Sequence, residues 1–160
     1  MHKNVAAAVA TVAAVGALLG GSQFNPGPQH PRTALWYARL DKPSFTPPGP
    51  AFGIAWTALD GLLAYTGYRL LTHAPSAARR VALGAWILTL SGIPAFSWRF
   101  FGARQSDEAL GVSATMLASA VGLTASASKV DQKAAATSLP LIAWLVFATV
   151  LQEEVWRRNR

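Results

Sequence analysis

Five stretches of the chain are dominated by apolar residues, and polar or basic segments separate them. The stretches are Val5–Gly21, Ala51–Leu71, Val81–Phe101, Glu108–Ser128 and Ala134–Trp156. Each approaches the roughly 20 predominantly apolar residues that a helix needs to cross a bilayer, and apart from Asp60 their charged residues lie near an end. Because the connections after the second, third and fourth stretches are short, neighbouring helices should run antiparallel. The pattern predicts an all-α integral membrane bundle of five transmembrane helices, forming a single domain over residues 1–160.

The first stretch, Val5–Gly21, allows two interpretations. It is short, rich in alanine and preceded by Met1-His2-Lys3-Asn4, which is also the pattern of a secretory signal peptide. It has no clear stop before Gly20, however, and the remaining stretches need a first insertion event. We therefore expect it to form the first helix of the bundle.

The connection from Ser22 to Pro50 is far longer than an ordinary loop and contains seven of the ten prolines. Proline fixes φ and so lowers the entropy cost of ordering the backbone. Trp36, Tyr37 and Phe45 give this segment apolar surface with which to dock. We expect a long ordered loop between the first two helices that caps the bundle. The alternative is an aromatic belt at head-group depth, which Trp and Tyr favour in any membrane protein.

Composition excludes several classes of function. Residues are 52% hydrophobic and only 13% charged, against roughly a quarter charged in soluble domains. There is no cysteine, and the three histidines lack metal-ligand spacing, so we expect no metal site. The net charge of +7 resides mostly between or at the ends of the apolar stretches, which favours contact with lipid head groups over nucleic acid. No nucleophile–base arrangement is visible, so the sequence predicts no catalytic residue and no required cofactor.

Trp56 and Asp60 are four positions apart and share one face of the second helix. A carboxyl group inside a membrane is costly and usually faces a cavity or a partner. Asp60 is therefore either a ligand contact or proton-linked group, or a carboxyl that is hydrogen-bonded to a neighbouring helix or kept neutral by burial.

The last two aromatic patterns lie in the third and fifth helices. Trp144, Ala148 and Leu151 line one face of the fifth helix beside Phe147, forming an aromatic wall with a notch that suits a planar apolar ligand. Plain core packing is the alternative. In the third helix a break at Gly92 and Pro94 precedes several aromatic residues, among them Phe96 and Trp98.

Small residues recur every four positions in the fourth helix, at Ala114, Ala118, Gly122 and Ser126. This spacing lets helix backbones approach closely in lipid. The stripe indicates either packing inside the bundle or the interface of a homodimer.

Three segments carry a family resemblance: WYARLDKPSFTPPGPAFGIAWTAL at Trp36–Leu59, AFSWRFFGAR at Ala95–Arg104 and LPLIAWLVFATVLQEEVWRRN at Leu139–Asn159. With the five-stretch layout, the chain resembles the tryptophan-rich sensory protein (TspO/MBR, translocator protein) family over nearly its whole length. The resemblance implies a five-helix bundle, often dimeric, whose first loop caps a pocket for porphyrins, notably protoporphyrin IX, and for benzodiazepine-type or sterol-like compounds. It implies a role in tetrapyrrole regulation, sensing or transport, with light- and oxygen-dependent porphyrin degradation as the alternative. A bacterial cell membrane is the expected location.

Matched position by position, the resemblance implies a defined ligand pocket. Its residues are Trp36, Trp56, Phe96, Trp144 and Ala148, with Tyr37, Asp60, Trp98, Phe147 and Leu151 as further candidates. The chain also departs from the family pattern. Asp60 stands where the family usually has an aromatic or apolar residue, Ile93 replaces a common Asn, and Leu141 replaces a Tyr.

Overall fold

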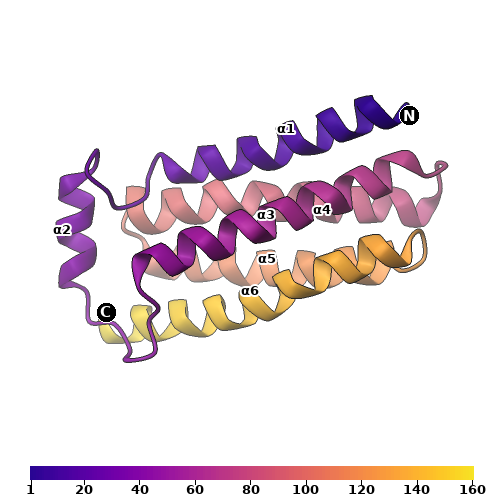
Figure 1. Ribbon diagram of the computed structural model, residues 1–160. Helices are drawn as coiled ribbons and strands as arrows, with labels where there is room; N and C mark the ends of the chain where they lie inside the picture. Colours follow the sequence, from indigo (N-terminus) through magenta and orange to yellow (C-terminus); the bar gives the residue numbers. More distant parts are fainter.

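The computed structural model describes residues 1–160 and is all-helical. In chain order the elements are α1 (Lys3–Ser22), α2 (Pro31–Arg39), α3 (Gly49–Thr72), α4 (Ala77–Ser97), the π-helical turn η1 (Trp98–Gly102), α5 (Ser106–Ala127) and α6 (Gln132–Arg158). The five long helices lie side by side, while the short α2 stands across one end of the bundle (Figure 1). The C-terminus lies at the α2 end and the N-terminus at the opposite end (Figure 1).

Four helical segments are long and apolar enough to cross a membrane: α1, α4 continued through η1, α5 and α6. This is the layout of a multi-pass membrane protein. Helix α3 has 24 residues, which is long enough, but it is not one of the four. Its glycines and polar residues, Asp60 and Arg69 among them, dilute its apolar character. The fifth crossing, predicted over Ala51–Leu71, therefore stays a prediction.

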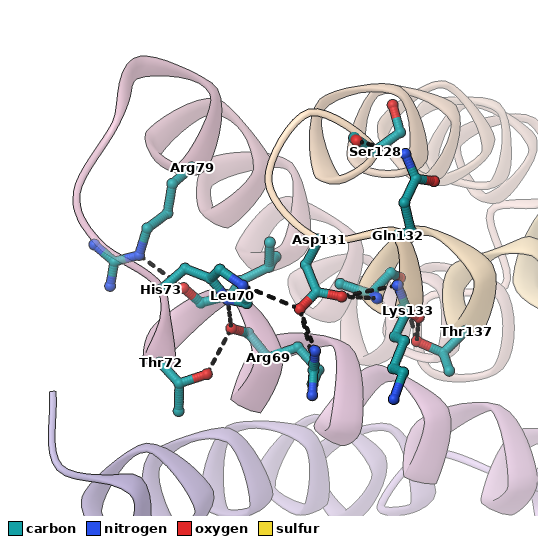
Figure 2. Close-up of polar contacts among 11 residues, drawn as sticks. Arg69, Leu70, Thr72, His73, Arg79, Ser128, Asp131, Gln132, Lys133 and Thr137 are labelled. Carbon is teal, nitrogen blue, oxygen red and sulfur yellow. Dashed lines mark hydrogen bonds and ion pairs between the residues drawn. The ribbon is translucent and has the colours of Figure 1, made fainter.

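Two of the long helices, α4 and α6, begin earlier than their apolar stretches because capping residues set their first turns. The Ser76 side chain accepts a hydrogen bond from the Arg79 backbone N–H at 3.1 Å, so α4 begins at Ala77 rather than Val81. The Asp131 carboxylate accepts from the backbone N–H groups of Lys133 and Ala134 at 2.8 and 3.0 Å and so begins α6 (Figure 2). These caps satisfy backbone donors that have no partner within the helix.

Glycines allow α4 to approach α3 and α5 closely. A Cβ on Gly67 of α3 would lie 2.4 Å from a ring carbon of Trp86, whose Nε1 donates to the Leu63 carbonyl at 2.9 Å. A Cβ on Gly92 would lie 2.2 Å from Cγ of Met116 in α5. Only glycine permits these approaches, which is the way small residues pack helices in lipid.

Hydroxyl groups join adjacent helices across the core. The pairs are Thr66–Thr137 between α3 and α6 (2.9 Å), Thr89–Ser119 between α4 and α5 (2.8 Å), and Thr124–Ser138 and Ser113–Thr149 between α5 and α6 (2.7 and 2.8 Å). Interhelical hydrogen bonds of this kind contribute about 0.6 kcal/mol each. They fix the rotation of each helix, and with it the direction of the aromatic side chains at the α2 end.

Helix α1 is part of this packing. Ala6, Ala10 and Ala14 are fully buried, and a Cβ on Gly20 would lie 3.4 Å from the ring of Pro94 in α4. Of the two interpretations of the first apolar stretch, its integration into the bundle favours the helix.

The segment between α1 and α3 is fixed by hydrogen bonds within itself and to the end of α6. Lys42 Nζ donates to the carbonyls of Tyr37 at 2.7 Å and Leu40 at 2.9 Å, where α2 ends. The Asp41 backbone N–H donates to Asn159 Oδ1, and Asn159 Nδ2 donates back to the Asp41 carbonyl, both at 2.9 Å. Asp41 and the end of α6 therefore form a reciprocal clasp.

Candidate functional site

An aromatic group lies where α2 meets the end of α4. Phe100, in the π turn, is only 4% exposed and contacts the other rings edge-on or stacked. We call this the α2 aromatic group: Trp36 (5.5 Å from Phe100 between ring centroids), Tyr37 (6.2 Å), Phe96 (5.7 Å, stacked), Phe101 (4.8 Å) and Phe100 itself. The π turn makes the group possible because it changes the helix pitch just where Phe100 and Phe101 follow Phe96.

A second group lies where the start of α3 meets α6. Trp144 is at its centre, with centroids 5.8 Å from Phe52, 6.4 Å from Trp56 and 5.5 Å from Phe147. Phe45, from the segment that follows α2, packs edge-on against Phe147 at 6.3 Å. We call Phe45, Phe52, Trp56, Trp144 and Phe147 the α6 aromatic group.

The two groups form one continuous apolar surface. Phe100 and Leu151 belong to the same buried cluster, and Phe52, Phe96 and Phe147 all pack against it. Aromatic residues from the α1–α3 connection, α3, α4 and α6 thus converge beneath α2, at one end of the bundle.

The structure brings most of the predicted pocket residues together. Trp36, Tyr37 and Phe96 belong to the α2 aromatic group, and Trp56, Trp144 and Phe147 to the α6 aromatic group. Ala148 is half-buried one turn from Trp144, and Leu151 is buried between the groups. Trp98 does not join them: it is 45% exposed, and the Arg99 guanidinium lies over its ring at 4.1 Å.

Two buried polar atoms near the α6 aromatic group have no hydrogen-bond partner, Asp60 Oδ1 and Trp144 Nε1. Asp60 is 4% exposed and lies one turn beyond Trp56 on α3. Buried polar groups are hydrogen-bonded in the great majority of proteins, so each exception needs an explanation.

The basic residues around α2 differ in whether their charged groups are already engaged or are exposed. Lys42 is occupied by the carbonyls that end α2 and lies 4.8 Å from the Tyr37 ring. Arg104, which sequence reasoning did not single out, lies over the Trp36 ring at 5.5 Å and is exposed, as is Arg39. Burial raises the pKa of the Tyr37 hydroxyl, so this group stays protonated and adds no negative charge here.

Two hollows lie away from the aromatic groups. One hollow of about 330 Å³ lies between α1 and α4, where its lining includes Gly16, Trp86 and Pro94. Another, of about 530 Å³, lies on the outer side of α3 along Pro50, Gly53 and Thr57. None of the predicted pocket residues lines either hollow.

The sequence itself decides the classification. A profile of the TspO/MBR family matches residues 7–157. The chain belongs to the TspO/MBR family. A translocator protein of Homo sapiens is 32% identical over 143 residues, which cover 87% of this chain and 81% of the relative.

Microbial members of the TspO/MBR family are similar to the chain as well. The tryptophan-rich protein TspO of Archaeoglobus fulgidus is 34% identical over 159 residues, covering 98% of this chain and 99% of the relative. Protein CrtK of Rhodobacter capsulatus is 28% identical over 140 residues, covering 87% and 83%. Membership of this family and the four apolar helices together make the chain an integral multi-pass membrane protein.

Sequence reasoning placed Phe100 among the aromatic residues that follow Pro94 but did not assign it to the ligand pocket. A regular helix beginning at Ala77 gives no signal for a π turn there. Arg104 follows the same turn with φ of 60°, a backbone conformation that aligns its guanidinium with Trp36 and that residue type alone does not predict.

Proposed function

We propose that this protein binds porphyrins, such as protoporphyrin IX, and similar flat apolar ligands against the two aromatic groups, and that it acts in tetrapyrrole regulation, sensing or transport. One observation carries the proposal: aromatic residues from four parts of the chain converge into a single apolar surface under α2. Stacking and apolar burial on such a surface suit a large planar ring. The proposal needs no cofactor and no metal.

Binding would replace ring–ring contacts by ring–ligand contacts. The Trp56–Trp144 and Phe52–Trp144 pairs now meet edge-on, at interplanar angles of 85° and 75°. A macrocycle inserted between them would gain face contacts of at least equal strength. The exposed guanidinium groups of Arg39 and Arg104 would remain at the rim for the carboxylates of the ligand.

The proposal includes a membrane setting with α3 as the fifth crossing. Helix α3 has 24 residues, within the range of 20 to 27 residues of the other crossing helices, and it packs against α1, α4 and α6. These neighbours shield its polar side from lipid. Basic side chains at the helix ends would contact anionic head groups, and a bacterial cell membrane stays a prediction.

We also propose a homodimer through α5. Ala114 and Ala118 of the small-residue stripe are exposed in the single chain, and nothing lies within 4 Å of a Cβ placed on Gly122. Because the chain has no cysteine, Ala118→Cys provides a single thiol for oxidative cross-linking in membranes. A disulfide-linked dimer is expected for Ala118→Cys and not for Val12→Cys, which is 71% exposed on α1. Equal yields from both positions would contradict this interface.

Titration with protoporphyrin IX tests ligand binding. We expect saturable quenching of tryptophan fluorescence at micromolar ligand, and binding weakened about tenfold or more in Trp144→Ala, which loses a fully engaged aromatic wall. Trp98→Ala is the matched control because Trp98 lies outside both aromatic groups, and it should bind like the wild type. Absence of saturable quenching, or equal losses in the two variants, would overturn the proposal.

The same sample separates binding from chemistry. The two indoles of Trp56 and Trp144 are in direct contact, so a bound porphyrin would lie against a redox-active pair, which keeps light- and oxygen-dependent degradation as a second candidate. Under illumination in air, an unchanged Soret band indicates binding alone. A product band that disappears in Trp56→Phe indicates that the indole takes part in porphyrin oxidation.

A further inference from the structure

Asp60 Oδ1 and Trp144 Nε1 are the two buried side-chain polar atoms in this protein that have no hydrogen-bond partner. They are of opposite kinds, since a carboxyl oxygen accepts hydrogen bonds and an indole nitrogen donates one. They lie on two helices that contact each other: Asp60 follows Trp56 by one turn of α3, and the Trp56 ring lies 6.4 Å from the Trp144 ring of α6. The two helices that carry this pair of indoles therefore also carry an unfilled acceptor and an unfilled donor.

The other buried polar side chains of the bundle have hydrogen-bond partners. Asp131, the other buried carboxylate, receives hydrogen bonds from Arg69 and from two backbone N–H groups. Buried Gln152 donates to the Ser106 carbonyl at 3.0 Å. Asp60 has no such partner and no ion pair. Burying an unpaired carboxyl group costs free energy, which leucine or phenylalanine at this position would avoid.

We propose that Asp60 and Trp144 are hydrogen-bonding anchors that make this site prefer flat aromatic ligands with an N–H donor on the edge of the ring. The Asp60 carboxyl oxygen accepts the ligand N–H, and the Trp144 indole N–H donates to a ligand oxygen. A site built to receive a hydrogen bond discriminates strongly against a ligand that lacks it, because the buried group is then left unpaired.

This preference deepens the proposed function and rests on the proposed insertion of a flat ligand between the aromatic rings of α3 and α6. It also extends that function beyond porphyrins. The pyrrole N–H groups of a closed porphyrin point into the centre of the macrocycle, so its edge offers Asp60 no donor. Smaller fused heteroaromatic compounds with an edge N–H and a carbonyl group match both anchors.

Acridone and xanthone form a matched pair of probes. Both are flat tricyclic ketones of nearly the same shape, and they differ in that acridone has a ring N–H where xanthone has an oxygen atom. Equilibrium binding is measured with protein in lipid nanodiscs, and the signal of empty nanodiscs is subtracted because both compounds partition into lipid. The wild type should bind acridone about fivefold or more tightly than xanthone, the discrimination expected when one compound leaves a buried acceptor unpaired.

Three variants test which side-chain atoms produce the preference for acridone. Asp60→Leu removes the acceptor and should bring the affinity ratio to about one, with xanthone bound at least as tightly as before. Asp60→Asn keeps an acceptor oxygen and should keep the preference. Trp144→Phe removes the donor that both carbonyl ligands use, so it should weaken both to a similar degree and leave the ratio unchanged.

The outcomes are distinguishable from failure of the proposed function. A ratio near one in the wild type, or a preference that persists in Asp60→Leu, overturns the anchor role even where protoporphyrin IX binds saturably. A preference for acridone that depends on Asp60, together with no binding of protoporphyrin IX, supports the anchors and overturns the porphyrin proposal. Loss of binding by both classes overturns both.

Discussion

The guanidinium of Arg69, near the end of α3, donates from Nε at 2.9 Å and from Nη2 at 2.5 Å to one oxygen of Asp131, the residue that begins α6 (Figure 2). The other carboxylate oxygen of Asp131 accepts from the backbone N–H groups of Lys133 and Ala134. One side chain therefore caps a helix and pairs with a neighbouring helix, at the end of the bundle opposite α2.

Removing the charge of Asp131 should destabilise the fold. Asp131→Asn keeps an oxygen for the cap but leaves the Arg69 guanidinium, only 28% exposed, without its counter-charge. We expect a loss of about 2 kcal/mol in the free energy of unfolding, measured by denaturant titration in detergent micelles. Glu153→Gln, on the exposed side of α6, is the control and should change stability by less than about 0.5 kcal/mol. Equal effects would show that Asp131 contributes no specific pairing.

Stability should fall in acid because of the same carboxylate. Burial alone would raise the pKa of Asp131, but the Ala134 and Lys133 N–H groups and the Arg69 guanidinium together hold it below the ordinary value of 3.8. A carboxyl group whose pKa is lower in the folded state contributes its full stabilisation of the fold above its unfolded-state pKa. That contribution is lost as the pH falls through the folded-state pKa. The difference in unfolding free energy between wild type and Asp131→Asn should be constant above about pH 5 and shrink below about pH 4. A difference that does not change between pH 6 and pH 3 would contradict this.

Gly67→Ala should disrupt the contact between α3 and α4. The new methyl group would lie 2.4 Å from the rigid Trp86 ring, whose hydrogen bond to the Leu63 carbonyl fixes its place. We expect a loss of about 1–3 kcal/mol from overpacking, seen as a lower thermal midpoint. Gly61→Ala is the matched control in the same helix: nothing lies within 4 Å of its Cβ, and it should be neutral or slightly stabilising.

Asn159→Ala should loosen the segment that follows α2. It removes both hydrogen bonds between Asp41 and the end of α6, which are the reciprocal clasp at this site. With about 1 kcal/mol for each of the two hydrogen bonds, about 2 kcal/mol in all, opening of the segment should increase roughly thirtyfold. Faster tryptic cleavage after Arg39, and faster quenching by protoporphyrin IX in stopped flow, would both report it. Asn25→Ala, which changes an exposed Asn in the same long connection, should leave both rates as they are.

Much of the fold follows from apolar patterning, because each apolar stretch became the middle of a long helix. The first residues of α4 and α6 could not be predicted from apolar patterning. Ser76 and Asp131, which set them, lie outside the apolar stretches and act through hydrogen bonds to the backbone. The pairing of Arg69 with Asp131, 62 positions apart, depends on how two helices align and has no local signal.

The aromatic site was predictable in part for a similar reason. Trp56 and Trp144 stand out as tryptophans on regular helices, so helical spacing places them correctly. The sequence does not show that Lys42 is occupied: its ammonium group contacts the carbonyls at the end of α2, because unpaired carbonyls at a helix end attract a nearby cation. Trp98 was a candidate that the structure leaves exposed beside Arg99.

The π turn at Trp98–Gly102 has one more consequence. The Ala103 N–H donates to the Trp98 carbonyl at 2.7 Å, five residues back, so this turn contains a residue more than its neighbours. A helical wheel drawn with a single pitch from Ala77 to Gly102 therefore assigns Phe100 and Phe101 to the wrong sides. Deleting one residue here would restore a uniform helix while rotating Phe100 by about 100° away from Trp36, so the length of this short segment, as much as its composition, keeps the aromatic surface assembled.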